Sequence, residues 1–263
     1  MPASTRSTRP SSLTAACLSL ALARQQLAVC LQPRVDCRTR SVCGAEASLH
    51  LRHPRLGLLA PHRYGPLAEQ AGLAAELDQW MLDAACRQIG QCGAVGGSAW
   101  SITVPVSIST LQDPSFQGRV CSALDRSSLP APRLILRLPP SIILAGPDAY
   151  RHVFGLLGMG VQLSMAEQDE FCAAPTRLSS APLHELPIPQ SLINALDQCV
   201  IARVTAAALI TEWKRAGLRV FAGGVIREQQ HTFLDELGCD TAQGALYGDL
   251  PQAMSRACIT SPR

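Results

Sequence analysis

Residues 28–51 of this 263-residue chain read AVCLQPRVDCRTRSVCGAEASLHL. Two short apolar segments lie inside this stretch, at 28–31 and 44–51, and each predicts a β-strand. Further strands are predicted by apolar runs at 101–108, 134–138, 161–165, 186–188, 220–222 and 241–244. Strands that alternate with helices are typical of parallel sheets with helical crossovers. The length of the chain fits one closed (β/α)8 barrel.

Helices are expected between these strands. Helices are predicted over 65–89, 148–157, 190–216 and 228–237, the first of them from apolar residues close to a 3.6-residue period. The third carries Lys214 and Arg215 in its last turn and Gly217 just beyond, which are typical signals of a helix C-terminus. The stretch 93–99 is rich in glycine, and we expect it to be a loop.

The N-terminus allows two interpretations. Residues 1–12 are rich in Ser, Thr, Pro and Arg, and we expect a disordered tail. Basic residues precede the apolar run 13–23, which could be the centre of a secretory signal. We favour an amphipathic first helix, because cleavage after Ala23 would remove an element that the fold uses. No apolar run reaches the ~20 residues that a transmembrane helix needs, so we expect no membrane contact.

The composition is that of a globular protein, with 47% hydrophobic and 16% charged residues. The net charge of +3 is too small to indicate nucleic acid, so no nucleic-acid partner is expected. The 11 cysteines form no C-x-x-C pair, which argues against a zinc site or a thioredoxin-like motif. A reducing, cytoplasmic location is expected, because a chain of this length buries a core without disulfides.

Several short motifs occur in a fixed order along the chain. They are LQP at 31–33, GAEA at 44–47, HPRLG at 53–57, PLAEQAGL at 66–73, LGCD at 237–240 and QG at 243–244. In that order and at those intervals, they resemble the EAL domain of bacterial cyclic di-GMP signalling, over about residues 13 to 256. The resemblance implies a TIM-like (β/α)8 barrel of the EAL type. We expect a domain over 13–258, between tails at 1–12 and 259–263.

The resemblance also implies a site at the carboxyl ends of the barrel strands, where two divalent metal ions support hydrolysis of one phosphodiester of cyclic di-GMP. Glu46 matches the first metal-binding carboxylate of the family. Gln32 and Gln243 match positions that contact the nucleotide. Glu167 keeps the acidic character of an Asp-Asp turn, and His50 stands where a phosphate-contacting arginine is usual. These five residues form the predicted, vestigial ligand-binding set.

Other positions of the implied site have changed. Arg137 stands where the family has a metal-binding glutamate, and Pro105 where it has an asparagine. The residues 187–189, Pro-Ile-Pro, replace Lys-Ile-Asp, and Gly223 and Ile226 replace two glutamates. One carboxylate does not hold two hard dications, and a fixed like charge at ~4 Å costs about 4 kcal/mol even against a monovalent ion. We therefore expect no metal ion, no cofactor and no catalytic residue, and hence a protein that is not an enzyme.

A metal cluster of Glu46 with His50 and His53 is a further reading of the same segment. The two histidines do not have the spacing of ligands on one helix face, so an ordinary surface or core role is favoured for each.

Three functions fit this sequence. The first is a catalytically inactive EAL-like regulatory protein in motility or biofilm control, which binds a protein partner such as a transcription or motility regulator. The alternative is a cyclic di-GMP receptor that does not hydrolyse its ligand, and the second alternative is a phosphodiesterase with residual activity. The resemblance implies dimerisation through the loop after the Asp-Asp turn. That loop is rebuilt here, so the oligomeric state stays open.

Overall fold

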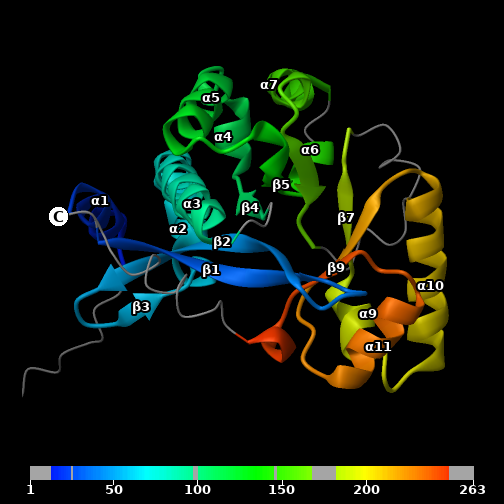
Figure 1. Ribbon diagram of the computed structural model, residues 1–263. Helices are drawn as coiled ribbons and strands as arrows, with labels where there is room; N and C mark the ends of the chain where they lie inside the picture. The colour runs from blue at the N-terminus through cyan, green and yellow to red at the C-terminus, as the bar shows by residue number, and fades with distance from the viewer. Residues whose placement is uncertain (1–12, 25, 97–99, 145–146, 168–181, 249–263) are drawn as a thin grey trace, which may run out of the picture.

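The computed structural model describes residues 13–24, 26–96, 100–144, 147–167 and 182–248 (Figure 1). The predicted tails at 1–12 and 259–263 lie outside the described residues, as does most of the loop expected to follow Glu167.

Nine strands of the described chain form one sheet, and eight of them close into a barrel in the order β1-β9-β8-β7-β6-β5-β4-β2, with β2 returning to β1. Their bounds are β1 (Leu27–Asp36), β2 (Val42–His53), β4 (Ser101–Pro105), β5 (Leu134–Leu138), β6 (Gln162–Met165), β7 (Glu185–Ile188), β8 (Arg219–Ala222) and β9 (Thr241–Ala242). Only β1 runs antiparallel to both of its barrel neighbours. The short β3 (Gly57–Leu59) pairs with the end of β2 outside the ring. The predicted (β/α)8 barrel is confirmed.

Helices surround the strands (Figure 1). Their bounds are α1 (Ala15–Ala23), α2 (Pro61–Gln70), α3 (Ala74–Gly96), α4 (Ile108–Gln112), α5 (Phe116–Ser127), α6 (Ser141–Leu144), α7 (Pro147–Gly158), α9 (Gln190–Ala195), α10 (Val200–Arg215) and α11 (Glu228–Glu236). Alternate strand residues fill the space between barrel and helices. On β5, for example, Leu134, Leu136 and Leu138 are fully buried, because successive side chains of a strand point to opposite faces. The residue between the last two, Arg137, faces the barrel interior and contacts Glu46 across it.

Two predicted helices are each divided in the structure. The helix expected over 65–89 becomes α2 and α3, because Gly72 adopts a φ of +68° that ends the first helix. The helix expected over 190–216 becomes α9 and α10, separated by a turn at 196–199. The loop expected at 93–99 is also partly wrong, since α3 continues to Gly96. The periodicity of side chains shows where helices lie but not where the chain turns between two of them.

The predicted first helix is present as α1 (Ala15–Ala23), but its apolar residues are not confined to one face, and Leu20 is exposed. The Thr14 hydroxyl accepts a hydrogen bond from the Cys17 amide and caps the N-terminus of α1. Leu18 and Ala21 are almost fully buried, so α1 contributes to the core of the fold. Within the described part of the chain, no helix is both long enough and apolar enough to cross a membrane.

Candidate functional site at the carboxyl end of the barrel

Three of the predicted site residues meet at the carboxyl end of the barrel. Gln32 on β1 is the register partner of Glu46 on β2. Gln243 directly follows β9, and its side-chain amide donates a 2.5 Å hydrogen bond to the Gln32 side-chain oxygen. The side-chain oxygen of Gln243 itself is buried and has no protein partner. The mouth therefore presents an unsatisfied acceptor beside a carboxylate.

Glycines set the backbone on which these side chains stand. A Cβ at Gly44 would lie 2.6 Å from the Ser101 carbonyl oxygen, so only glycine lets β2 approach β4 this closely, two residues before Glu46. Gly244 packs against the backbone of Val225, where any side chain would collide. The Val225 amide also donates to the Gln243 carbonyl at 3.0 Å. The glycines of the GAEA motif at 44–47 and of the QG motif at 243–244 thus fix Glu46 and Gln243 in place.

Arg137 is the nearest charged neighbour of Glu46. Its Nη1 donates to a Glu46 carboxylate oxygen at 2.7 Å, and the two side chains are 9% and 16% exposed. The guanidinium also lies over the Phe221 ring, 4.8 Å from its centroid. The predicted positive charge among the implied metal ligands is therefore present, and it neutralises the one carboxylate that matches the family there.

A second ion pair lies deeper in the barrel, and sequence reasoning missed it. Arg34 donates to Glu185 at 2.6 Å, to Thr103 at 2.7 Å and to Thr241 at 2.8 Å. Ser164 donates to the other Glu185 oxygen at 3.1 Å. Both residues lie outside the apolar runs 28–31 and 186–188 that predicted these strands, so the apolar pattern carried no signal for the pair.

The charges inside the barrel are balanced. Burial opposes ionisation of the Glu185 carboxyl, but the positive charges of Arg34, Arg137 and Arg219 outweigh that penalty and lower its pKa. Burial likewise opposes the charged form of Arg34, and the charge of Glu185 reverses this and raises the arginine pKa. Glu185 and Arg34 are both charged at neutral pH, and each depends on the other.

The other two predicted site residues differ in their placement, because Glu167 lies at the same end of the barrel and His50 lies further along β2. Glu167 follows β6, and its carboxylate lies against Gly223 after β8. His50 lies four residues beyond Glu46 along β2, about 13 Å at the rise of a strand. Its Nδ1 is 3.5 Å from the Ser48 hydroxyl. His50 is therefore not part of the Gln32–Glu46–Gln243 group.

The side chains at the mouth do not fit a pair of divalent cations. Such ions need several carboxylate or carbonyl oxygens around each of them. Glu46 is already bound to Arg137, and Pro105, the register partner of Arg137, offers no side-chain oxygen. Among the residues that the structure describes, no group of three or more His, Cys, Asp or Glu side chains is placed to hold a metal ion.

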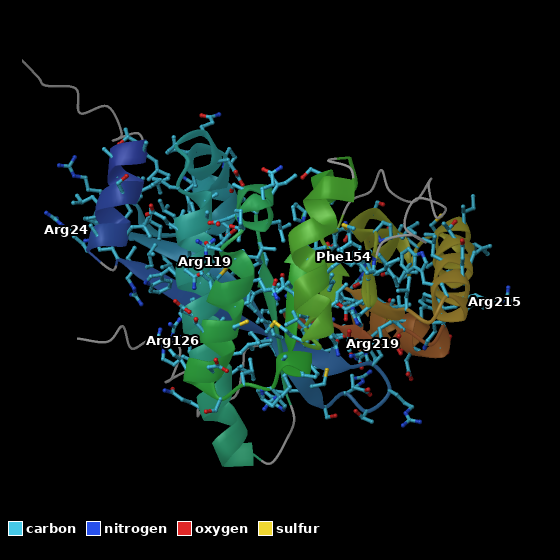
Figure 2. The ribbon with its side chains drawn as sticks, turned by 90° about the horizontal axis from the view of Figure 1, so that it is seen from above. Arg24, Arg119, Arg126, Phe154, Arg215 and Arg219 are labelled. Atoms are coloured by element: carbon cyan, nitrogen blue, oxygen red, sulfur yellow. The ribbon has the colours of Figure 1, made fainter. Side chains whose placement is uncertain are left out.

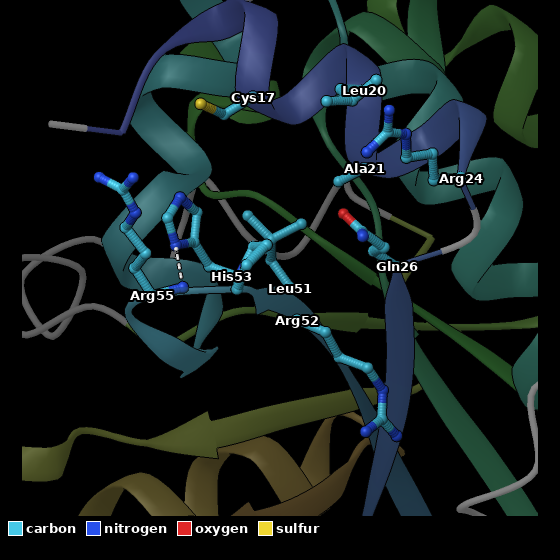
Figure 3. Close-up of a pocket in the computed structure, with 10 residues that line it drawn as sticks. Cys17, Leu20, Ala21, Arg24, Gln26, Leu51, Arg52, His53 and Arg55 are labelled. Carbon is cyan, nitrogen blue, oxygen red and sulfur yellow. Dashed lines mark hydrogen bonds between the residues drawn. The ribbon is translucent and has the colours of Figure 1, made fainter. Parts of the chain in front are cut away.

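A separate cavity of about 260 Å³ lies outside the barrel, between α1 and the end of β2 (Figure 3). Cys17, Leu20 and Ala21 of α1 face Leu51 across it, so the lining is mainly apolar. At its edge, the Nδ1 atom of His53 accepts hydrogen bonds from the amides of the two residues after Pro54, at 3.2 and 3.1 Å. His53 therefore stabilises a turn, and this role argues against the interpretation that it binds a metal ion together with Glu46.

Comparison with known proteins agrees with this architecture. The family described as EAL domain matches residues 15–249. The chain belongs to the EAL domain family. The bifunctional diguanylate cyclase/cyclic di-GMP phosphodiesterase MucR of Pseudomonas aeruginosa is 33% identical over 232 residues, which cover 88% of this chain and 34% of MucR. The cyclic di-GMP phosphodiesterase NbdA of the same organism is 30% identical over 231 residues, which cover 88% of this chain and 30% of NbdA. The chain thus spans about a third of the length of these curated relatives.

Solved structures of EAL domains have the same fold. A PaMucR phosphodiesterase in complex with c-di-GMP has 31% sequence identity and a TM-score of 0.80, covering 90% of this chain and 97% of that chain. The FimX EAL domain from Pseudomonas aeruginosa bound to c-di-GMP has 22% identity and a TM-score of 0.77, covering 91% of this chain and 96% of that chain, and at this identity it supports the fold alone. The family match and the similar structures therefore agree on an EAL-domain barrel.

These comparisons correct one expectation. From the changed motif positions we expected a protein that is not an enzyme. MucR, NbdA and a third relative, PA2567 of Pseudomonas aeruginosa, are all named as cyclic di-GMP phosphodiesterases, and that expectation is therefore wrong. It rested on separate ligand positions, whereas the similarity extends over the whole barrel. The loss of one ligand position changes how a reacting group is held, but it does not by itself determine the rate of the reaction.

Proposed function

We propose that this chain binds cyclic di-GMP at the carboxyl end of its barrel, where Gln32, Glu46, Gln243 and Arg137 lie. The observation that carries the proposal is the pattern of buried polar atoms without protein partners. Gln243 leaves one acceptor open, and Arg137 leaves donors at Nε and Nη2. Buried polar groups of this kind are normally satisfied, so both need a ligand or water. A guanine nucleotide supplies N–H donors for the first and phosphate oxygens for the second.

Two further facts support this ligand. The site lies at the carboxyl ends of the strands, where the ligands of (β/α)8 proteins bind. The similar PaMucR structure was solved as a c-di-GMP complex.

The test is calorimetric titration of the protein with cyclic di-GMP. Saturable binding is expected, and Gln243→Ala should weaken it by about tenfold, the effect of one lost hydrogen bond to a buried site. The matched control is Gln70→Ala, which changes an exposed glutamine at the end of α2. No heat of binding at any accessible concentration, or equal losses in both variants, would refute the proposal.

A second candidate function is cyclic di-GMP phosphodiesterase activity, which the names of MucR, NbdA and PA2567 favour. Separation of the titrated mixtures by chromatography measures it directly, because hydrolysis of one phosphodiester yields the linear dinucleotide. If product forms, it should form at the same rate in Gln70→Ala and more slowly in Gln243→Ala. Equal rates in all variants would indicate a contaminating enzyme.

Control of motility or biofilm formation through a protein partner, in the cytoplasm, stays a prediction. A pull-down from the native host, with and without cyclic di-GMP, tests it. A partner whose recovery changes with the dinucleotide is expected, and failure to recover any partner reproducibly would count against it.

A further inference from the structure

Two arginines are buried inside the barrel among the described residues, and they differ in how their donors are used. Arg34 donates through both terminal nitrogens, to Thr103, Glu185 and Thr241, and leaves Nε alone without a protein partner. The Arg137 residue is 8% exposed, and its hydrogen bond to a described side chain is the 2.7 Å bond from Nη1 to Glu46. Its Nε and Nη2 are buried without a protein partner. Unsatisfied donors on a buried charge are costly, so they point to an anion that the site receives.

The ring of Phe221 holds the Arg137 guanidinium without using its donors. Phe221 lies between the two arginines, with ring-centroid distances of 4.2 Å to Arg34 and 4.8 Å to Arg137. A cation over an aromatic face is stabilised while its N–H groups stay free in the plane of the guanidinium. The charge of Arg137 is thus fixed in position before any ligand arrives.

Arg137 also stands at the place where the family resemblance puts a metal-binding glutamate, next to Glu46 at the barrel mouth. The metal ions of such a site would neutralise phosphate charge. A guanidinium carries positive charge permanently, and its parallel N–H groups match phosphate oxygens. We propose that Arg137 itself binds a phosphate group of cyclic di-GMP, and that this chain therefore binds the dinucleotide without a divalent metal ion. This inference rests on the function proposed above and concerns binding alone.

Glu46 takes a different role in this arrangement. Its carboxylate occupies Nη1 of Arg137 and competes with the phosphate for the same guanidinium. Glu46→Gln removes the competing negative charge and should make cyclic di-GMP bind more tightly. If a divalent ion held by Glu46 were the phosphate-binding group, the same substitution would make the dinucleotide bind more weakly. The direction of this one change separates the two mechanisms.

The experiment is calorimetric titration with cyclic di-GMP, once in EDTA and once in excess Mn²⁺. The same dissociation constant is expected in both buffers. Arg137→Leu should weaken binding by about tenfold or more, the effect of losing a charge-assisted hydrogen bond. The matched control is Arg126→Leu, which removes an arginine of α5 that is 62% exposed and paired with Asp83 outside the barrel (Figure 2). Arg126→Leu should bind like the wild type.

Glu46→Gln keeps the experiment decisive if Arg137→Leu does not fold, because it leaves Arg137 in place. Binding that appears only with Mn²⁺ and vanishes in EDTA would overturn the inference and leave the proposed function standing. Weaker binding by Glu46→Gln, or a titration with Mn²⁺ alone that shows two tightly bound ions, would also overturn it. Absence of binding in both buffers would refute the proposed function and the inference together.

Discussion

Glu185→Leu is expected to destabilise the fold by about 3–5 kcal/mol, the usual cost of leaving the partner of a buried ion pair without its counter-charge. The side chains of Arg34 and Glu185 are only 2% and 3% exposed and lie 2.6 Å apart. Two unit charges at ~4 Å with an effective dielectric constant of 20 interact by about 4 kcal/mol, which is consistent with this range. For a domain of this size, 1 kcal/mol lowers the melting temperature by about 2–4 °C. A fall of roughly 6–20 °C is therefore expected.

Urea unfolding followed by far-ultraviolet circular dichroism measures the free energy of unfolding. Arg126→Leu is the control, because the Arg126–Asp83 pair is solvent-exposed and such a pair contributes about 1 kcal/mol or less. The double variant Arg34→Met with Glu185→Leu should recover part of the loss, since no buried charge remains from the pair. A Glu185→Leu protein within about 1 kcal/mol of the wild type would refute this reasoning.

Three other predictions concern the same barrel. The lowered pKa of Glu185 means that its contribution to stability is complete above the unfolded pKa of about 4.3 and is lost as the pH falls through the folded pKa. The urea midpoint of Glu185→Gln should therefore decline less on acidification than that of the wild type, and parallel declines would contradict this. Gly44→Ala should lower the free energy of unfolding by about 1–3 kcal/mol, because its Cβ would press on the Ser101 carbonyl. Gly65→Ala, at a position of α2 with open space around it, should instead raise the free energy of unfolding by up to about 1 kcal/mol. Equal effects of the two substitutions in thermal melts would contradict the steric argument. Tyr64→Phe should cost about 1 kcal/mol, since the buried Tyr64 hydroxyl donates to a carbonyl of β2 at 2.6 Å, and a calorimetric melt unchanged from the wild type would show that this bond adds nothing.

The strands were the most predictable part of the fold. The run at 134–138 was predicted with the bounds that β5 has in the structure, because a buried strand between turn residues leaves a short apolar segment in the sequence. Helix ends were less predictable. The break at Gly72 depends on a backbone conformation that the apolar pattern does not encode, and α5 lies in a segment for which no element was predicted.

For the site, the amino-acid sequence was enough to show which residue types stand at the ends of the strands, including Glu46, Gln243 and the unexpected Arg137. Family resemblance placed them at one end of a barrel. The folded barrel was needed to show that Arg137 binds Glu46, 91 positions away, and that Arg34 binds Glu185, 151 positions away. Such contacts depend on the register and closure of the whole barrel, which bring distant strands into one interior. Local patterns of apolar and polar residues carry no information about which buried charged side chains form a pair.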